Sequence, residues 1–544
     1  MKNKKIVAII CLATLLLACK KEKTYPSFNK WQAYDETELI EESQKNENPS
    51  LRYKLIQSKI SDKNDLLNVV QPQLENFTED TYKKIAPFVF EKSIAEIQEF
   101  IEADKISYKL LTQWYLYRIV ITETNADLSL NAIISVNPNA VKEAEKLDKN
   151  KANKQHPIFG MPIVLKDNIN TKNIKTTAGA AFLIDHQPKE DATIVKHLKS
   201  NGAIILGKAN LSEWANFLCA GCPNGYSAVG GQTLNPYGIR KFDTGGSSSG
   251  SAVSTAVNYA VGAVGTETSG SILSPSSQQS VVGLKPTLGS LSQDGIIPIS
   301  STLDTPGPIT KNTLDNFILY DAMQNKNSEF KLHLEEEIQA PNQIRLGIIE
   351  SLMEDSLYRE TVIKLEEDGF HIELISPENM DFSGFLELLN GDMKRDLASY
   401  FKEFKSKPKT SENVKDVVEF NKTDSINYIP YGQARLDGIL AQNLSDEQVD
   451  SVRINLLNAG KTYFETHFKS HQLDAILSIN NYHAGQAAVA KYPAITVPMG
   501  YKNTGEPQGL TFIGKPNQEE LLLKLTYLFE KIETKRQRPE KYKL

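Results

Sequence analysis

The sequence predicts an α/β fold, with a central mixed β-sheet covered by helices on both faces. Two observations lead to this prediction: short apolar runs alternate with helical patterns from residue 93 onward, and the composition is that of an ordinary globular protein. Of 544 residues, 40% are hydrophobic and 24% are charged, which excludes a disordered or collagen-like chain. No apolar run reaches the roughly 20 residues that a membrane-spanning helix needs, so no spanning helix is predicted.

The N-terminal part of the folded chain is predicted to be helical. Residues 19–90 are rich in Lys, Glu and Asn, and we expect a tether that leads into short helices such as 51–70. From Ser93 onward, the stretches 94–101 and 110–117 carry apolar residues at the spacing i, i+3, i+4, i+7. Each of these two stretches is therefore predicted to be a helix with a single apolar face.

The remaining elements alternate between strands and helices. Helical patterns occupy 191–200 and 517–534. Residues 350–470 are mostly helical and charged, and we expect them to form a covering layer over the sheet. Six short apolar runs are predicted to be buried strands, namely 162–165, 203–206, 344–349, 475–479, 495–497 and 510–513.

The first 19 residues have the pattern of an export signal. Three lysines precede an apolar stretch at 6–18, which is too short to span a membrane and typical of a secretory signal core. The sequence LLAC at 16–19 resembles the lipobox of bacterial lipoproteins, which implies cleavage of a signal peptide, 1–18, and lipidation of Cys19. We expect an exported chain, anchored only by this lipid in the bacterial cell envelope, at the periplasmic face or outer membrane. The alternative is an ordinary signal peptide in which Cys19 is coincidental.

Charge and cysteine content argue against nucleic-acid and metal partners. The formal net charge is −6 and becomes −9 when the three signal-peptide lysines are lost, whereas nucleic-acid affinity requires a cationic face. Cys219 and Cys222 form a lone C-x-x-C in a loop rich in Gly, Pro and Asn, and no second pair of ligands completes a zinc site. A disulfide and two free thiols remain open for this pair.

Residues 245–283 form the most unusual segment, with 7 Gly and 11 Ser in 39 positions. Small residues recur every four positions at 252–260, which predicts a closely buried helix rather than a flexible linker. Two Gly/Ser loops, 245–251 and 265–271, flank this helix. Because Gly lets backbone N–H groups approach a ligand and Ser supplies hydroxyls, we expect both loops to belong to a site.

Three serine chemistries match parts of the sequence. GSSSG at 246–250 fits the G-x-S-x-G elbow of α/β-hydrolases around Ser248, but no apolar strand precedes it. An S-x-x-K pattern at 27–30 lies in the expected tether and is interpreted as chance. The third chemistry is a serine served by Ser and Lys, for which Lys166 at the end of the run 162–165 is a candidate base. By spacing alone, a lysine in that position is more often a surface residue.

An ordered series of motifs resembles the amidase signature family. The series comprises GMPIVLKDNI at 160–169, TTAGA at 176–180, GAIILGKANLSEWANF at 202–217, GGSSSGSA at 245–252, GTETSGSILSP at 265–275, GLKPTLG at 283–289, DTPGPIT at 304–310 and YPAITVPMG at 492–500. Each motif alone is weak, but eight in the same order are a strong signal. The resemblance implies one large amidase-signature domain at 91–540, with 350–470 as its helical covering region.

The resemblance also implies a catalytic site that needs no cofactor and no metal. By the family pattern, Lys166 is the general base, Ser247 is the bridging serine after a cis peptide bond, and Ser271 is the nucleophile. Four backbone N–H groups would form the oxyanion hole, those of Thr268, Ser269, Gly270 and Ser271. The expected reaction is hydrolysis of an amide C–N bond through an acyl-enzyme on Ser271, because a buried neutral lysine can take the serine's proton.

Some positions depart from the family pattern and leave the substrate open. Ser269 stands where the peptide-amidase-like branch often has an acidic residue, and Leu273 where many members have Arg. A small-molecule or a peptide amide is expected as substrate, and no oligomeric state is predicted. One rival hypothesis is the A subunit of a tRNA-dependent amidotransferase, which the export signal and acidic charge disfavour. The other is a catalytically inactive, substrate- or partner-binding lipoprotein on an amidase scaffold, which the presence of all three triad residues disfavours.

Overall fold

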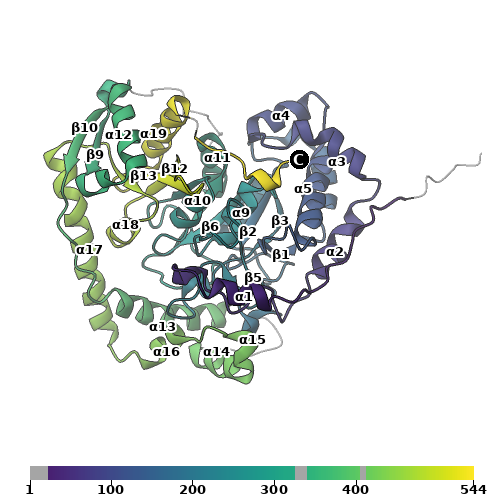
Figure 1. Ribbon diagram of the computed structural model, residues 1–544, viewed down its shortest axis with the longest axis horizontal. Helices are drawn as coiled ribbons and strands as arrows, with labels where there is room; N and C mark the ends of the chain where they lie inside the picture. Colours follow the sequence, from purple (N-terminus) through teal and green to yellow (C-terminus); the bar gives the residue numbers. More distant parts are fainter. Residues whose placement is uncertain (1–22, 325–339, 405–411, 534) are drawn as a thin grey trace, which may run out of the picture.

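The computed structural model describes residues 23–324, 340–404, 412–533 and 535–544, and its centre is an eleven-stranded mixed sheet (Figure 1). The strand order is β1-β3-β2-β6-β8-β7-β12-β13-β11-β9-β10. The strands are β1 (Ile133–Val136), β2 (Pro162–Lys166), β3 (Ile204–Ala209), β6 (Gly262–Glu267), β7 (Val282–Lys285), β8 (Thr305–Thr310), β9 (Arg345–Ile349), β10 (His371–Ile375), β11 (Ala475–Ile479), β12 (Ala494–Tyr501) and β13 (Pro507–Ile513). A separate hairpin pairs β4 (Tyr226–Ser227) with β5 (Gly231–Gln232). All six predicted strands form, and the predicted mixed α/β sheet is confirmed.

Strand direction decides which residues meet at one edge of the sheet. β2 pairs in parallel with β3 and with β6, whereas β8 pairs antiparallel with β6 and β7. The carboxyl ends of β2 and β6 therefore reach the same edge. This places Lys166, the last residue of β2, near Thr266 at the end of β6.

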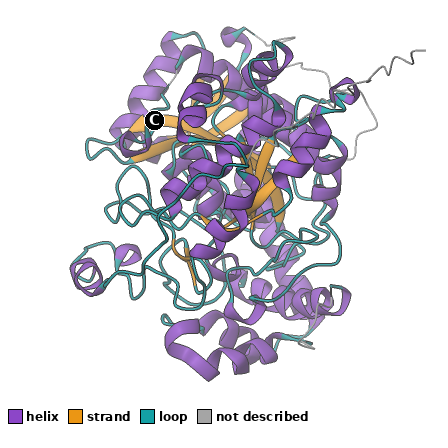
Figure 2. Ribbon diagram, turned by 90° about the vertical axis from the view of Figure 1, so that its right-hand side faces the viewer, coloured by secondary structure: helices purple, strands orange, loops and turns teal. Residues whose placement is uncertain are grey.

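Helices cover both faces of the sheet (Figure 2). A Cβ built on Gly265 of β6 would lie 2.8 Å from Ser248 Oγ, at the start of α9, whereas one on Gly262 would lie 3.5 Å from Leu319 of α11. Because residues three apart in a strand face opposite ways, α9 and α11 lie on opposite faces. α10 contacts α9, and α7 and α19 contact α11. The helices are α1 (Thr37–Ser43), α2 (Asn64–Val70), α3 (Glu79–Ile85), α4 (Ile94–Glu102), α5 (Tyr108–Glu123), α6 (Ala140–Asp148), α7 (Thr193–Ser200), α8 (Glu213–Asn216), α9 (Ser249–Ala256), α10 (Leu273–Gln278), α11 (Thr313–Met323), α12 (Ser356–Glu367), α13 (Phe385–Glu403), α14 (Val414–Asn421), α15 (Ser425–Tyr428), α16 (Ala434–Ala441), α17 (Asp446–Ser470), α18 (Ala484–Ala490) and α19 (Glu519–Ile532).

Two helices differ from their predictions. α4 begins at a capping box between Ser93 and Glu96 and has the expected buried stripe, but α5 is buried almost all round, because it packs against α2, α6 and β2. The small-residue helix α9 forms but ends at Ala256 instead of continuing to residue 260. Asn258 adopts a left-handed conformation (φ 60°) there, which ends the helix and turns the chain toward β6.

The fully buried α9 packs closely enough to exclude side chains at one position. A Cβ built on Gly250 would lie 2.5 Å from the carbonyl oxygens of Ala132 and Asn210. Only glycine allows this approach of backbone to backbone, and it fixes the N-terminal end of α9 against the loop after β3.

Residues 350–470 are largely helical, as expected, and also contain β10, an edge strand that the sequence did not predict. Of these helices, α12 packs on β12. In contrast, α13, α14 and α16 bury a second apolar cluster against loops that follow the strands, and Figure 1 shows them below the sheet. The cluster joins helix residues such as Leu388 and Leu436 to loop residues such as Leu183, Trp214 and Ile299. Most of this layer therefore covers the loops at the edge of the sheet rather than a sheet face.

The described part of the N-terminal segment packs against the domain. Lys23 Nζ lies 2.8 Å from the Glu75 carboxylate, and Asn76 N donates to Thr24 O at 2.7 Å. α2 and α3 contribute buried side chains to the main core. Cys19 and the predicted signal peptide 1–18 lie outside the described residues. Among the helices that the structure does describe, none combines the length and apolar character needed to cross a membrane.

Candidate active site

Lys166 is fully buried at the carboxyl end of β2. Its Nζ is hydrogen-bonded to Ser247 Oγ at 2.8 Å, to Thr266 O at 3.0 Å and to Thr266 Oγ1 at 2.9 Å. Asn168 Nδ2 also donates to Thr266 Oγ1, at 3.0 Å. The amine is thus fixed by neutral oxygen atoms from two other segments of the chain.

Burial lowers the pKa of Lys166 from 10.5 to about 7, although the negative charges of Asp304 and Glu267 oppose the effect. A substantial fraction of the side chain is therefore neutral at neutral pH. A neutral amine has two N–H donors and one lone pair. If Thr266 O and Thr266 Oγ1 accept the two donors, the lone pair faces the hydroxyl of Ser247. This arrangement can accept a proton from that hydroxyl.

Ser247 is fully buried in the first Gly/Ser loop, and the Gly246–Ser247 peptide bond is cis. Its carbonyl oxygen accepts a hydrogen bond from Ser212 N at 3.1 Å. The next residue, Ser248, donates through its Oγ to Thr266 O at 3.0 Å. The loop is therefore attached to the same strand end that surrounds the amine of Lys166.

Ser271 follows β6 in the second Gly/Ser loop and is 7% exposed. Its carbonyl oxygen accepts from Ser248 N at 3.1 Å, and this bond joins the two loops. Within the described residues, its Oγ makes no hydrogen bond, so the hydroxyls of Ser247 and Ser271 are not bonded to each other. The structure brings Lys166 and Ser247 into direct contact and places Ser271 on the adjoining loop with a hydroxyl available to a ligand.

The loop before Ser271 presents free backbone donors. Ile272 N and Leu273 N donate to Glu267 Oε2 at 2.7 and 3.0 Å. In the described part of the chain, four other N–H groups have no acceptor, those of Thr268, Ser269, Gly270 and Ser271. Free N–H groups beside a serine hydroxyl are suited to bind a developing oxyanion.

Two buried acidic residues support the site and were missed by the sequence reasoning. Asp304 accepts from Thr268 Oγ1 at 2.6 Å and from Ser300 N at 3.0 Å, and burial raises its pKa to about 6. Asp167 lies 3.6 Å from Lys208 Nζ, and burial raises the pKa of this acid while lowering that of Lys208 to about 8. Both acids lie inside motifs quoted above, which was the available signal. Among the described residues, no group of three His, Cys, Asp or Glu side chains is placed to hold a metal ion.

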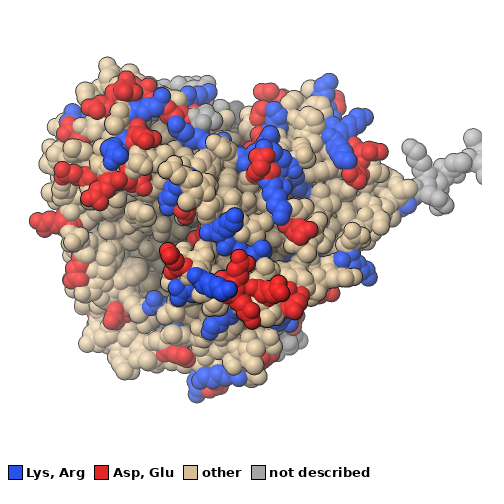
Figure 3. Space-filling model, in the orientation of Figure 1, with Lys and Arg blue, Asp and Glu red and all other residues tan. Residues whose placement is uncertain are grey.

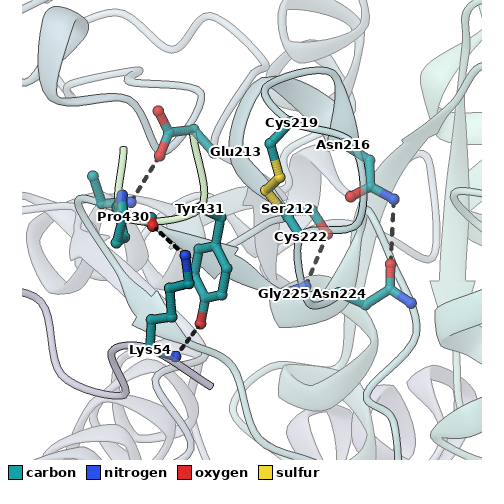
Figure 4. Close-up of a disulfide and its surroundings, with 11 residues drawn as sticks. Lys54, Ser212, Glu213, Asn216, Cys219, Cys222, Asn224, Gly225, Pro430 and Tyr431 are labelled. Carbon is teal, nitrogen blue, oxygen red and sulfur yellow. Dashed lines mark hydrogen bonds between the residues drawn. A yellow bond between two sulfur atoms is a disulfide. The ribbon is translucent and has the colours of Figure 1, made fainter. Parts of the chain in front are cut away.

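Cys219 and Cys222 form a disulfide, with Cα atoms 5.8 Å apart (Figure 4), so the pairing left open by the sequence is present. The loop after it carries Asn224, whose Oδ1 would lie 2.9 Å from a Cβ built on Gly246. The following N–H, of residue 225, donates to Ser212 Oγ at 2.8 Å. The disulfide loop therefore packs directly against the peptide bond that precedes Ser247.

The segment before the disulfide is strained. Trp214, Ala215 and Asn216 have φ values of 52°, 55° and 78°, all in the left-handed region that side-chain-bearing residues avoid. Asn216 Nδ2 donates to Asn224 Oδ1 at 3.2 Å, which ties this strained turn to the disulfide loop. Covalent closure of the loop thus helps to hold the turn.

Reduction of the disulfide is expected to lower stability by about 2 kcal/mol, because the bond closes only a short loop. It is also expected to lower activity severalfold, since the contact of Asn224 with Gly246 is loosened. The measurements are the melting temperature and turnover with and without a thiol reductant. The double variant Cys219→Ser/Cys222→Ser is the control and should not respond to reductant. Equal melting temperatures for the wild type in both conditions would contradict the prediction.

Comparisons with known proteins agree with this geometry. The amidase family profile matches residues 118–478. A probable amidase of Arabidopsis thaliana is 32% identical over 482 residues, covering 83% of this chain and 91% of its own. The crystal structure of an amidase family protein from Bacillus anthracis has a TM-score of 0.84 and 35% identity, covering 89% of this chain and 99% of its own. Native peptide amidase from Stenotrophomonas maltophilia has a TM-score of 0.77 and 32% identity, covering 83% and 99%.

A component of an amidotransferase is also similar to this chain. The A-type polypeptide of the glutamyl-tRNA(Gln) amidotransferase from Exiguobacterium sibiricum is 28% identical over 501 residues, which cover 81% of this chain and 97% of that polypeptide. The similarity thus extends across proteins of two different roles, and the geometry of the site has to be weighed with it.

Proposed function

The chain belongs to the amidase family and is a hydrolase of amide C–N bonds, and we propose that it cleaves peptide amides through an acyl-enzyme on Ser271. The observation that carries the proposal is the fully buried amine of Lys166. It is hydrogen-bonded at 2.8 Å to Ser247, in a loop that is bonded to the backbone of Ser271. The 32% identity to a peptide amidase over 99% of that enzyme supports a peptide amide as the substrate.

In the proposed reaction, Ser271 Oγ attacks the carbonyl carbon of the amide. Its proton passes to Ser247, whose own proton passes to the lone pair of Lys166, so that the amine becomes an ammonium as the C–O bond forms. The proton then returns through Ser247 to the amide nitrogen, the C–N bond breaks, and ammonia or an amine leaves. Water attacks the acyl ester on Ser271, gives its proton to the same relay, and releases a carboxylic acid. Substrate binding is proposed to align the two serine hydroxyls, since catalytic hydrogen bonds often tighten only in the substrate complex.

The carbonyl oxygen becomes negatively charged in this step, and the free N–H groups from Thr268 to Ser271 are proposed to bind it. Loss of one such donor typically costs about a hundredfold in rate. Thr268 is held by its hydrogen bond to the buried Asp304, so the loop has its shape before substrate arrives. No metal or cofactor takes part in the proposed reaction.

The test uses the full chain, expressed with its N-terminal segment, and C-terminally amidated peptides. Release of ammonia, together with labelling of Ser271 by a fluorophosphonate probe, is the expected result. Matched peptides with a free C-terminal carboxylate serve as the control and should give no ammonia. Absence of both hydrolysis and labelling would favour the rival hypothesis of an inactive binding protein on an amidase scaffold.

Similarity to the amidotransferase component favours a second candidate function, in which the chain acts within a tRNA-dependent complex. This candidate requires companion proteins. Co-purification of such companions, with glutamine-dependent amide transfer in place of peptide amide hydrolysis, would establish it over the first.

We also propose that the protein is exported and carries acyl groups on Cys19. The lysines, the apolar stretch and the LLAC sequence in the first 19 residues support this proposal. A Cys19→Ala variant is expected to lose incorporation of labelled palmitate and to leave the membrane fraction. Equal labelling of wild type and variant would refute lipidation at this residue.

A further inference from the structure

A second wall of the candidate site lies opposite the nucleophile loop, in the turn between β11 and α18. A Cβ built on Gly270 would lie 2.9 Å from Asn481 Nδ2 and 3.4 Å from the Cβ of Ala484. Gly270 precedes Ser271 and has a left-handed φ of 84°, so both contacts are immediately beside the nucleophile. The space-filling view is hollowed left of its centre, in the region that Figure 1 bounds by α18, α13 and β6 (Figure 3).

The backbone of this turn is firmly attached to the sheet. Asn480 N donates to Gly509 O at 2.9 Å, and Asn480 Oδ1 accepts from Gly509 N at 2.8 Å. Asn480 also has a left-handed φ of 49°, which directs the chain out of β11 toward the nucleophile loop. The position of Asn481 is therefore set by β13. Asn481 itself is exposed, and in the described residues its carboxamide has no hydrogen-bond partner.

An aromatic side chain extends the same wall. A Cβ built on Gly485 would lie 3.0 Å from Phe382 Cζ and 3.8 Å from Ser269 Oγ, so this glycine separates the phenylalanine from the nucleophile loop. Phe382 is half-buried, and its ring lies 5.9 Å from that of Phe385 in an edge-on contact. The glycine leaves room beside the ring that any larger residue would fill.

The wall carries no charge. Its contacting side chains are an amide, a phenyl ring, a hydroxyl and a methyl group, those of Asn481, Phe382, Ser269 and Ala484. A charged group on the substrate would find no partner among them, and desolvating it would cost binding energy. An apolar side chain next to a peptide carbonyl matches this combination of a ring and a carboxamide donor.

We propose that Phe382 and Asn481 form the acyl-side subsite, in which Phe382 packs on an apolar side chain of the residue bearing the scissile amide and Asn481 donates to a substrate carbonyl. This inference rests on the proposed function and narrows it to peptide amides with an uncharged, apolar C-terminal residue. Phe382 and Asn481 are binding residues in this account, whereas proton transfer belongs to the triad.

The test compares kcat/KM for matched peptide amides that end in Phe, Leu, Gly or Asp. The wild type is expected to prefer Phe and Leu amides. Phe382→Ala is expected to lower kcat/KM for these two substrates roughly tenfold or more, mainly through KM, and to leave the Gly amide within about twofold. The isosteric Asn481→Asp, which removes a donor and adds a charge, is expected to lower kcat/KM roughly tenfold for all four.

Matched variants away from the wall serve as controls. Leu374→Ala on the edge strand β10 and Asn503→Asp in the β12–β13 hairpin remove comparable groups from exposed positions and should preserve the whole profile. Phe382→Leu, which keeps an apolar side chain, should recover part of the preference if Phe382→Ala is poorly folded.

The outcomes separate the subsite from the function. If the wild type hydrolyses peptide amides but Phe382→Ala and Phe382→Leu lower all substrates by the same factor, the subsite is refuted and the proposed function stands. A preference for the Asp amide would also refute the subsite. If the wild type hydrolyses none of the peptide amides, the proposed function itself fails.

Discussion

Replacing Ser271 by alanine is expected to reduce amide hydrolysis by about 10⁴- to 10⁶-fold, because it removes the atom proposed to form the acyl-enzyme. The fold should persist, since Ser271 Oγ makes no hydrogen bond within the described residues and the backbone bond from Ser248 N to Ser271 O is retained. The measurement is single-turnover and steady-state release of ammonia from a peptide amide, together with the thermal midpoint of the variant.

The control for Ser271→Ala is Ser274→Ala, which removes a hydroxyl from the start of α10, three residues further along. This variant should keep activity within a fewfold of the wild type. Retention of more than about 1% of turnover in Ser271→Ala, in protein shown to be free of wild-type enzyme, would overturn the acyl-enzyme assignment. Loss of fluorophosphonate labelling in Ser271→Ala, but not in Ser274→Ala, would confirm the labelled atom.

Replacing Lys166 by methionine is expected to abolish turnover and, at neutral pH, to stabilise the protein. Keeping an amine of ordinary pKa 10.5 at a pKa of about 7 costs the folded state about 5 kcal/mol at pH 7 and below. Methionine removes this cost but also removes the hydrogen bonds to Ser247 and Thr266, each worth about 1 kcal/mol. A net gain of about 2 kcal/mol in the free energy of unfolding is therefore expected. Chemical denaturation of the two proteins measures it.

The sign of the pH effect follows from the direction of the pKa change. The unfolded lysine holds its proton up to about pH 10, whereas the folded one loses it above about pH 7, so wild-type stability rises between these values. The advantage of Lys166→Met should be full below pH 7 and disappear as the pH approaches 10. Wild-type kcat/KM should rise with pH through about 7, because only the neutral amine accepts a proton. A pH-independent stability difference, or activity that falls as the pH rises from 6 to 8, would contradict the buried neutral base.

Arginine at the same position supplies a matched test of the protonation state. Lys166→Arg keeps a positive charge at every accessible pH and cannot act as a base, so it should be inactive and less stable than the wild type. Methionine and arginine thus move stability in opposite directions while both remove activity. Measurable turnover by Lys166→Arg would argue against proton transfer through residue 166.

The sheet could be predicted because its strands are short, apolar and locally bounded, as in 162–165 and 510–513. Local patterns failed where tertiary packing overrides them. α5 is buried on all sides by neighbours distant in sequence, and α9 ends where Asn258 adopts a left-handed conformation that periodicity does not reveal. The edge strand β10 has mostly exposed or half-buried residues, so no apolar run marked it.

The site could be predicted in part, and only through a resemblance. Lys166 and Ser247 are 81 residues apart, and no local spacing indicates that a hydrogen bond joins them. Motif order supplied the pairing. The wall residues Phe382 and Asn481 belong to two loops outside the quoted motifs, and their approach to Gly270 and Gly485 depends on how α18 is positioned by the sheet. Only coordinates could place them.

The attachment of Lys23 to Glu75 and of Thr24 to Asn76 limits how far an acylated protein could stand from its membrane. Four residues separate Cys19 from Lys23, and an extended chain spans at most about 3.6 Å per residue, or about 14 Å in total. With acyl chains on Cys19, the side of the molecule bearing α2 and α3 would rest near the lipid headgroups. α17 and α18 lie on the other side of the molecule in Figure 1. Substrates would then arrive from the aqueous phase rather than by lateral diffusion within the bilayer.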